Sequence, residues 1–238
     1  MKTVIITRFP FQSQLGGEEL HTLAVAQHFK SSKLNVIFFF SCKVLEELAR
    51  DNDFEYHKAW LFKPPVSILT LIAFILLFPI LFIIGFFYVL RTIYLYEDVT
   101  FYMLSFGEKL LLTPWCYLFR INVIWLEHAR IGNWFHKNPY KKWYKLWAKY
   151  ATVVTVSDLM RRDIGIKDVK VIENAIKVKD FKQIKDVSVL PKKLRELFHD
   201  SKKTVGYVGR LTEDKGMKLI IEAAKSFKDT SFICVGAG

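Results

Sequence analysis

The sequence predicts an α/β protein with a mostly parallel sheet, followed by the beginning of a second unit of the same kind. Short apolar, β-branched segments alternate with segments of helical periodicity, which is the pattern of repeated strand–helix–strand units. Several of these strands lead through glycine-containing turns into helices, as in open parallel sheets. A chain of 238 residues is long enough for one large or two small domains.

Composition indicates an anionic partner and contact with a membrane. The chain has 35 Lys and Arg against 23 Asp and Glu, and this balance favours nucleic acid, anionic lipid or a phosphorylated substrate. Its 52% of hydrophobic residues is high for a soluble enzyme. Cys42, Cys116 and Cys234 are too widely spaced for a disulfide framework or a zinc site, so we expect buried, reduced thiols. The apolar run at the N-terminus is too short for a signal peptide and is predicted to be the first strand.

The first unit is predicted to contain strands with helices between them. The strands are expected at 4–7, 34–40, 54–60, 100–104, 121–126 and 152–156. Helices are expected to begin at Glu18 and to cover 44–50 and 108–119, although Pro114 weakens the first half of the latter. Ser157 is well placed to cap the helix after the sixth strand.

The turn after the first predicted strand contains Gly16 and Gly17. A double glycine at a strand-to-helix turn exposes backbone amides that can approach a phosphate closely. Glu18 and Glu19 follow in the first helical turn, where acidic residues suit the helix dipole. Because Gly-Gly also occurs in ordinary turns, the pattern alone leaves both interpretations open.

A long apolar segment, 64–90, contains no charged residue between Lys63 and Arg91. As a straight helix it would be about 40 Å long, against about 30 Å of bilayer hydrocarbon. A single span would place strands of one sheet on opposite sides of the membrane. Pro79 and Gly85 permit a kink or a re-entrant hairpin. We therefore expect a monotopic helix on the cytoplasmic face, with a true span and a helix buried in protein as the alternatives.

Glu127 and His128 follow the predicted strand 121–126. The carboxyl ends of core strands form the ligand-binding edge of such a sheet, so both are candidate site residues. The alternative for His128 is a histidine bonded to a local backbone group. His21 and His28 are expected on a helix surface.

The segment 133–150 interleaves lysines with aromatic residues. Its lysines are Lys137, Lys141, Lys142, Lys145 and Lys149, and its aromatic residues include Trp134, Phe135, Tyr140, Trp143, Tyr144, Trp147 and Tyr150. Tryptophan, tyrosine and lysine together favour the headgroup region of an anionic membrane. Stacking on single-stranded nucleic acid is a less favoured alternative, and a helix that packs its aromatic residues on the sheet is the ordinary one.

A second glycine-containing turn follows the predicted buried strand 204–208. Gly209 lets the chain turn, and Arg210 and Lys215 precede a helix that is expected to begin at Met217. Cations at the end of a strand and close to a helix N-terminus suit an anionic ligand. An ordinary turn with two solvated cations is equally consistent with the spacing.

This C-terminal segment resembles the family 4 glycosyltransferases of GT-B fold. The resemblance rests on Gly-Arg-Leu at 209–211, a polar spacer, Lys-Gly at 215–216, an apolar helix and Val-Gly-Ala-Gly at 235–238. It implies two Rossmann-like domains and retention of anomeric configuration. It also implies a nucleotide-sugar as co-substrate, with no cofactor and no divalent metal.

The resemblance also implies roles for individual residues. Arg210 and Lys215 are expected to hold the donor diphosphate, and Gly16 and Gly17, within a Gly-Gly-x-Glu loop, are expected to assist them. His128 is expected to face the acceptor and the donor sugar. Asn174 matches one position of a family loop, but its neighbours depart from the family pattern, which weakens any direct role for it.

The predicted organisation is an acceptor-side domain at 1–181, a linker at 182–203 and the first βαβ unit of a donor domain at 204–238. Because a downstream glutamate pair of the family would lie beyond this unit, the chain is interpreted as truncated. We expect a membrane-associated glycosyltransferase that acts on a lipid-linked or cell-envelope glycan acceptor. The alternative is a catalytically inactive fragment or a membrane-bound interaction module of the same fold.

Overall fold

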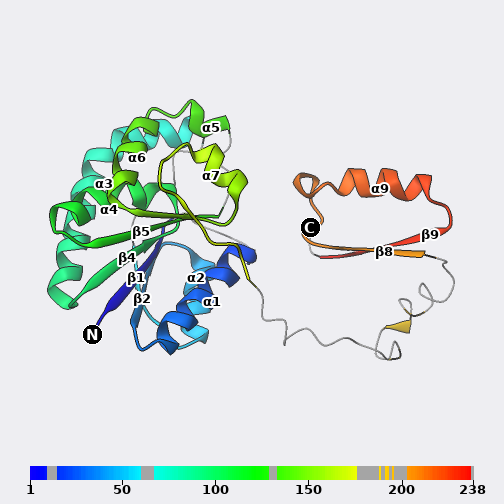
Figure 1. Cartoon of the computed structure of the whole chain (residues 1–238), viewed down its shortest axis with the longest axis horizontal. Coiled ribbons are helices and arrows are strands. Elements are labelled where there is room, and N and C mark those ends of the chain that lie inside the picture. The colour runs from blue at the N-terminus through cyan, green and yellow to red at the C-terminus, as the bar shows by residue number, and fades with distance from the viewer. Residues whose placement is uncertain are drawn as a thin grey trace. The chain divides into compact units, whose positions relative to one another are not determined.

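The structure is a computed structural model that describes residues 1–9, 15–59, 67–128, 133–175, 188, 191–192, 195 and 203–236, without the side chains of 133, 134 and 214. The chain divides into two compact units, Met1–Ala175 and Ile176–Gly238, which are described separately (Figure 1). Most of the predicted linker at 182–203 lies outside the described residues.

The first unit is built on a seven-stranded parallel sheet in the order β3-β2-β1-β4-β5-β6-β7. The strands are β1 (Thr3–Arg8), β2 (Asn35–Phe40), β3 (Glu55–Lys58), β4 (Val99–Met103), β5 (Asn122–Glu127), β6 (Thr152–Thr155) and β7 (Lys170–Val171). Every pair of neighbouring strands is parallel. The predicted α/β fold with a mostly parallel sheet is thus confirmed, and each predicted strand lies within a few residues of its observed position.

Helices connect these strands. They are α1 (Gly17–Ser31), α2 (Lys43–Asp51), α3 (Ile68–Leu95), α4 (Phe106–Leu118), α5 (Asn133–His136), α6 (Lys141–Trp147), the 3-10 turn η1 (Ala148–Tyr150) and α7 (Asp158–Ile164). Ser157 caps α7 as predicted, since its hydroxyl accepts a hydrogen bond from the Met160 amide. Pro114 is accommodated inside α4.

The lysine- and aromatic-rich segment does not form one helix. It breaks between α5 and α6, where Pro139 lacks an amide proton and Asn138 accepts a hydrogen bond from the Tyr140 amide at 2.9 Å. The side-chain amide of Asn138 replaces a helical carbonyl there, so the chain turns before α6 begins. Lysines and aromatic residues are therefore divided between two short helices.

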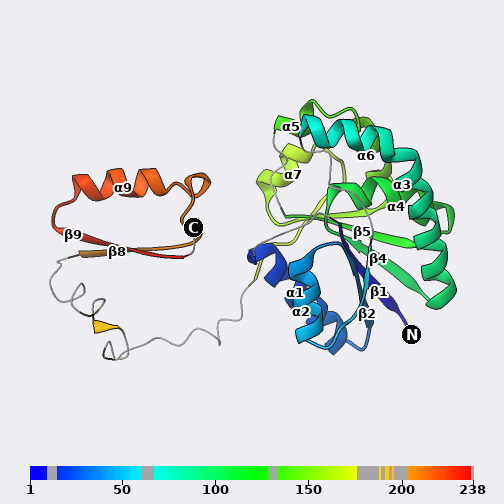
Figure 2. The same ribbon diagram turned by 180° about the vertical axis from the view of Figure 1, so that it is seen from behind.

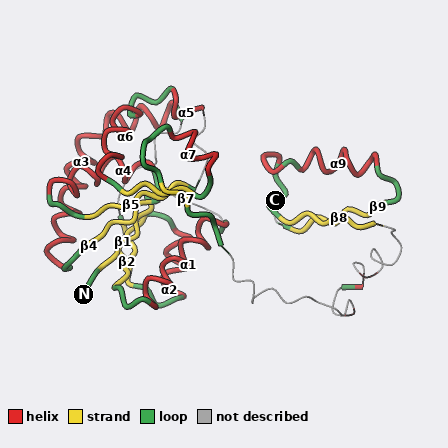
Figure 3. Tube along the Cα trace, viewed as in Figure 1, coloured by secondary structure: helices red, strands yellow, loops and turns green. Residues whose placement is uncertain are grey.

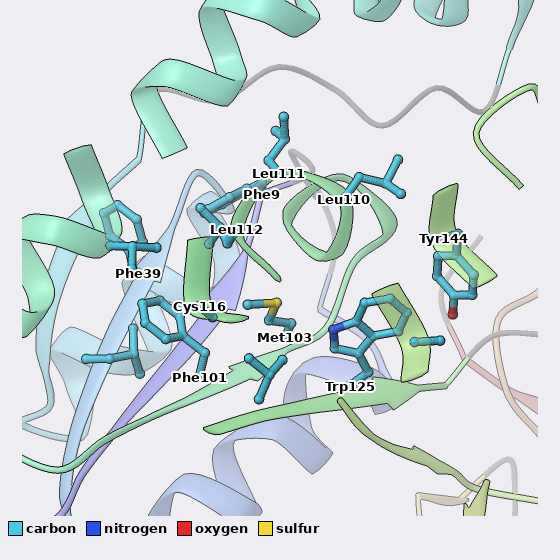
Figure 4. Close-up of a cluster of buried hydrophobic side chains, with 14 of the residues drawn as sticks. Phe9, Phe39, Phe101, Met103, Leu110, Leu111, Leu112, Cys116, Trp125 and Tyr144 are labelled. Atoms are coloured by element: carbon cyan, nitrogen blue, oxygen red, sulfur yellow. The ribbon is translucent and has the colours of Figure 1, made fainter. Parts of the chain in front are cut away.

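The sheet has a separate apolar core on each face. Helices α3, α4 and α6 cover one face and α1 and α2 cover the other (Figures 1 and 2). The core under α3, α4 and α6 includes Trp125, Phe101, Met103 and Tyr144, which converge on α4 (Figure 4). Figure 3 shows the strands enclosed between the two helical layers. Cys42 and Cys116 are buried, as expected.

The apolar segment forms a single 28-residue helix, α3, which continues through Pro79 and Gly85. Among the described residues it is long and apolar enough to cross a membrane by length and composition, with only 17% of its most apolar stretch buried. The strands before and after it, β3 and β4, belong to the same sheet. In this topology α3 is therefore the connection of a βαβ unit that passes over one face of the sheet.

One side of α3 packs against the protein and the other is apolar and exposed. Phe74, Leu81, Gly85 and Val89 are buried and recur at helical spacing. The exposed apolar residues of the opposite side are Ile68, Leu69, Ile72, Ile75, Leu76, Ile80, Ile83, Phe87, Leu90 and Tyr94. Such a long apolar stripe is unusual for a protein surface in water and marks an interaction surface.

Gly85 allows α3 to approach α4 closely. A Cβ at this position would lie 3.1 Å from the Leu111 carbonyl oxygen and 3.2 Å from a Leu112 methyl carbon. We expect Gly85→Leu to lower the free energy of unfolding by about 2 kcal/mol, because an overpacked contact must separate the helices. Urea unfolding measures this, with Gly107→Ala in α4 as the control. A Cβ at Gly107 would meet nothing within 4 Å, so that variant is expected to be neutral or slightly stabilising.

The second unit contains a parallel pair of strands, β8 (Lys203–Val208) and β9 (Thr230–Val235). The short turn η4 (Glu213–Lys215) and helix α9 (Met217–Ser226) connect them, and α9 begins at the predicted residue. The expectation that β8 is buried is wrong for the described residues, since Val208 is 84% exposed and α9 has no buried residue. One helix on a two-stranded sheet covers too little surface to bury the apolar side chains of β8. Cys234 in β9 is likewise exposed rather than buried.

Candidate active site at the carboxyl edge of the sheet

A dense group of charged side chains gathers where β1, β4 and β5 end and α1 and α4 begin. Its members, which we call the edge cluster, are Arg8, Glu18, Glu19, His21, Glu108, Lys109, Glu127 and His128. The carboxyl ends of parallel strands lie at one edge of the sheet, which is where α/β proteins bind ligands. The edge cluster is therefore the candidate functional site of the first unit.

Arg8 is the last residue of β1 and is bound by two carboxylates from the first turn of α1. Its guanidinium nitrogens lie 2.9 Å from Glu18 and 2.9 Å from Glu19. Arg8 and Glu19 are almost completely buried. Glu19 also accepts a hydrogen bond from the Gly16 amide at 2.9 Å. The Gly16 N–H is therefore already used by a carboxylate of the chain itself.

Lys109 lies 1% exposed beneath the ends of β4 and β5. Its ammonium donates to the carbonyl oxygens of Leu104 at 3.2 Å and Leu126 at 2.7 Å, and it also pairs with the Glu127 carboxylate. The hydroxyl of Tyr144 from α6 donates to the same Glu127 oxygen. A buried ammonium with three acceptors satisfies its charge and fixes the Glu127 carboxylate at the strand end.

Glu108 is buried at the start of α4, one residue before Lys109. One of its oxygens accepts from the backbone amides of Leu104 and Ser105, an arrangement that links the end of β4 to the helix. Burial raises the pKa of Glu108 from its ordinary 4.5 to about 7, against the opposing effect of those hydrogen bonds. At pH 7 the Glu108 carboxyl group is therefore partly protonated.

His128 follows β5 and its ring packs edge-to-face on His21 of α1, with the centroids 4.5 Å apart. His21 was expected on the helix surface. It is only partly buried, and it lies on the side of α1 that faces the end of β5. Burial, with the charges of His21, Arg8 and Lys109, lowers the pKa of His128 to about 4. Burial also lowers the pKa of His21. Both imidazoles are therefore neutral at pH 7.

Several buried polar atoms of the edge cluster and the adjoining Thr7 lack a hydrogen-bond partner within the described part of the chain. They are Thr7 Oγ1, Arg8 Nε, Glu108 Oε2 and His128 Nε2. Buried polar groups are nearly always satisfied, so a group of unsatisfied atoms at one edge indicates a place for water or a polar ligand. Carboxylates outnumber cations in the cluster, which suits hydroxyl donors better than an anion.

The structure brings some of the predicted residues together. Gly16 and Gly17 open α1 beside Arg8, and Glu127 and His128 end β5 at the same edge. Asn174 is exposed after β7. The roles assigned to all of these residues stay predictions.

Sequence reasoning missed Arg8, Lys109 and the pairing of Glu18 and Glu19 with Arg8. Arg8 ends an apolar strand, and Lys109 follows the turn at the end of another, so a charge immediately after a buried strand was the available signal. Their burial was not apparent, because charged residues are rarely buried unless they are paired.

Arg210 and Lys215 belong to the second unit. The Tyr207 hydroxyl donates to the Arg210 carbonyl at 3.1 Å and lies 3.4 Å from the Lys215 carbonyl, bracing the turn. Gly216 has a φ of 79°, a backbone conformation that favours glycine, and leads directly into α9. The predicted strand–turn–helix arrangement is thus observed. Among the described residues no three His, Cys, Asp or Glu side chains are placed to hold a metal ion.

The edge cluster makes a testable prediction about pH and stability. Glu108, with its raised pKa, stabilises the fold at low pH and loses this contribution as the pH rises from about 4.5 to 7. His128, with its lowered pKa, acts in the opposite sense and loses stabilisation as the pH falls from about 6.5 to 4. Glu108→Gln is therefore expected to make Tm rise more steeply between pH 4.5 and 6.5, and His128→Asn less steeply. Thermal unfolding curves that stay parallel to wild type in both variants would contradict these assignments.

Comparisons with solved structures give the fold class. The chain superposes on the crystal structure of Anabaena Alr3699/HepE in complex with UDP and glucose with a TM-score of 0.68 and 17% identity, covering 100% of this chain and 61% of that one. A glycosyltransferase from Rickettsia africae gives 0.61 at 15% identity, covering 99% and 68%. The UDP-GlcNAc 2-epimerase from Neisseria meningitidis bound to UDP-GlcNAc gives 0.55 at 11%, covering 98% and 65%.

These matches show that the chain has the Rossmann-like α/β fold of the GT-B proteins. It spans about three fifths of the length of the Anabaena chain (61%). No protein-family model and no curated protein matches the sequence. Because the matched structures include both a glycosyltransferase and an epimerase, the fold leaves the reaction open.

Proposed function

We propose that the chain acts in the transfer of a sugar from a nucleotide-sugar donor to a lipid-linked or cell-envelope glycan acceptor at a membrane surface. The observation that carries this proposal is the edge cluster, a buried and incompletely satisfied polar site at the carboxyl edge of a GT-B-like sheet. The similarity of the whole chain to Anabaena Alr3699/HepE, whose structures contain UDP and glucose or UDP-glucose, supports a nucleotide-sugar ligand.

In this proposal the two units have different roles. Arg210 and Lys215 neutralise charge on the departing diphosphate, an electrostatic role that needs no proton transfer. His128 and Glu127 contact hydroxyl groups of the acceptor or of the transferred sugar. Since Glu19 already occupies the Gly16 amide and carboxylates surround Arg8, Gly16 and Gly17 contribute less to the diphosphate.

The remaining features of the proposed reaction are those implied by the resemblance to family 4 glycosyltransferases. The anomeric configuration of the sugar is retained, and neither a cofactor nor a divalent metal takes part. The nucleotide-sugar is the co-substrate. These features are proposals that product analysis and assays with added chelator would test.

The membrane part of the proposal rests on α3. Its exposed stripe is continuous along a helix of about 42 Å, and Ile68 and Leu69 at its N-terminus are each 80% exposed. A helix that connects two strands of one sheet can insert its outer side into one leaflet while the sheet stays in water. We therefore propose a monotopic arrangement on the cytoplasmic face.

The experiment that tests the proposed reaction incubates the full chain with a panel of nucleotide-sugars, with and without vesicles that carry membrane-extracted acceptor lipids. Release of nucleotide diphosphate together with a glycosylated lipid is the expected result. Epimerised sugar without transfer would instead place the chain with the epimerases. Donor binding without any turnover would favour the inactive interaction module.

The membrane part has its own prediction. Leu76→Glu is expected to weaken binding to liposomes at least about tenfold, because it replaces a leucine that would be buried in the leaflet by a charge. Flotation measures this, with Leu219→Glu in α9 as the control. The two leucines are similarly exposed, 73% and 70%, but only Leu76 lies on α3. Equal binding by the two variants would contradict docking through α3.

A further inference from the structure

A pocket of about 460 Å³ lies beside the sheet between the end of α6 and the turn that joins α7 to β7. Its apolar floor includes Ala148, Ala151 and Val153. Three lysines line it, Lys145, Lys149 and Lys167, with Asp168 as its one acidic lining residue. The volume falls within the range of ordinary small-ligand sites, and the balance of charge in the pocket is positive.

The backbone holds this pocket in shape. Gly165 ends α7 with a φ of 60°, and its carbonyl accepts a hydrogen bond from the Lys145 ammonium at 3.1 Å. This contact fixes the turn against α6 and directs Lys145 towards the pocket. Lys149 and Lys167 make no ion pair or hydrogen bond with any residue that the structure describes, so their ammonium groups are available to a ligand.

The pocket lies in the same helical layer as α3. Phe78 of α3 stacks on Tyr140 at the start of α6, and α3, α4 and α6 share one core on one face of the sheet (Figure 2). At the other end of α6, Trp147 and Tyr150 contact Tyr117 of α4. Aromatic residues and lysines beside an apolar helix are the arrangement found at the headgroup level of a membrane.

We propose that this pocket binds the phosphate of an anionic phospholipid headgroup when α3 lies in the leaflet. The inference rests on the membrane docking in the proposed function and goes beyond it, because it replaces diffuse attraction by a defined site. Lysines from α6, η1 and the α7–β7 turn line one recess, and their charge suits a compact anion. A nucleic-acid strand would instead need a cationic groove that follows its backbone.

Charge-matched variants separate a defined site from diffuse attraction. Lys149→Gln/Lys167→Gln removes two pocket charges, and Lys137→Gln/Lys142→Gln removes two exposed charges outside the pocket. Diffuse attraction predicts the same loss for both pairs, about fivefold per lysine. A headgroup site predicts that the pocket pair loses at least tenfold more affinity than the control pair for vesicles with phosphatidic acid. Equal losses would overturn the proposal.

Two further arms complete the experiment. The protein should bind vesicles of phosphatidylglycerol less tightly than vesicles of phosphatidic acid at matched surface potential, because the phosphate monoester of phosphatidic acid is less hindered. Only the Lys149→Gln/Lys167→Gln variant should lose this preference. Inorganic phosphate is titrated into the full chain without vesicles. Phosphate binding through Lys149 and Lys167 with no preference among vesicles would assign the pocket to a soluble phosphate compound and overturn the lipid assignment.

The outcome is independent of turnover. If Leu76→Glu leaves vesicle binding intact while the pocket pair abolishes the phosphatidic acid preference, docking through α3 fails and the headgroup site stands. If Leu76→Glu abolishes binding and the two lysine pairs behave alike, α3 docks and the headgroup site fails. Circular dichroism of each variant confirms that the fold is retained.

Discussion

Arg210→Ala is expected to lower kcat/KM for the nucleotide-sugar donor by about 10²–10³-fold, because it removes one preorganised cation from the proposed diphosphate site. Lys215→Ala is expected to act in the same direction. The turn between β8 and α9 supports this expectation, because the Tyr207 hydroxyl contacts the carbonyl oxygens of both Arg210 and Lys215 and so fixes the backbone of the two residues. Steady-state kinetics with varied donor concentration measures the loss.

Lys218→Ala is the matched control. Lys218 is an exposed lysine of α9, paired with Glu213, and lies just beyond the proposed diphosphate turn. Its replacement should change kcat/KM by less than about threefold, as for a surface charge of small effect. Equal losses for Arg210→Ala and Lys218→Ala would show that the turn does not hold the donor.

Lys109→Met is expected to lower the free energy of unfolding by about 3 kcal/mol, because the largely buried Glu127 carboxylate then loses its counter-charge. The variant also removes the donor to the carbonyl oxygens of Leu104 and Leu126. Denaturant unfolding of the full chain measures the change, and Lys142→Met on the exposed side of α6 should stay within about 0.5 kcal/mol.

A double variant distinguishes an unpaired charge from simple loss of packing. If the cost of Lys109→Met comes from the stranded Glu127 carboxylate, Lys109→Met/Glu127→Gln should recover a large part of it. Additive losses in the two single variants would contradict a coupled pair. A Lys109→Met variant as stable as Lys142→Met would contradict the buried network altogether.

The sheet was predictable because its central strands are largely apolar on both faces and so stand out from the helices between them. The break between α5 and α6 was not foreseen, although Asn138-Pro139 is a recognisable helix-ending signal. The exposure of β8 was also not foreseen, because an apolar strand gives no information about how much protein covers it. The long segment 64–90 was predicted as a helix between strands of one sheet, and this is confirmed, since α3 connects β3 and β4 of the same sheet.

The residues of the candidate site that directly follow strands could be predicted from the sequence. Those that reach the site only through burial and packing could not. Glu127 and His128 are at a strand tip, so their position at the edge follows from the strand itself. His21 lies one helical turn into α1, and only the packing of α1 beside β5 brings it to His128. The ion pairs of Arg8 and Lys109 join residues far apart in the sequence, and local pattern does not encode such pairs.

The central claim is that the edge cluster takes part directly in sugar transfer. The most direct test is the turnover of His128→Ala, compared with wild type and with His136→Ala, which alters an exposed histidine of α5. We expect His128→Ala to lower kcat at least tenfold with little change in Tm, and His136→Ala to behave as wild type. Full turnover by a folded His128→Ala variant would contradict the claim.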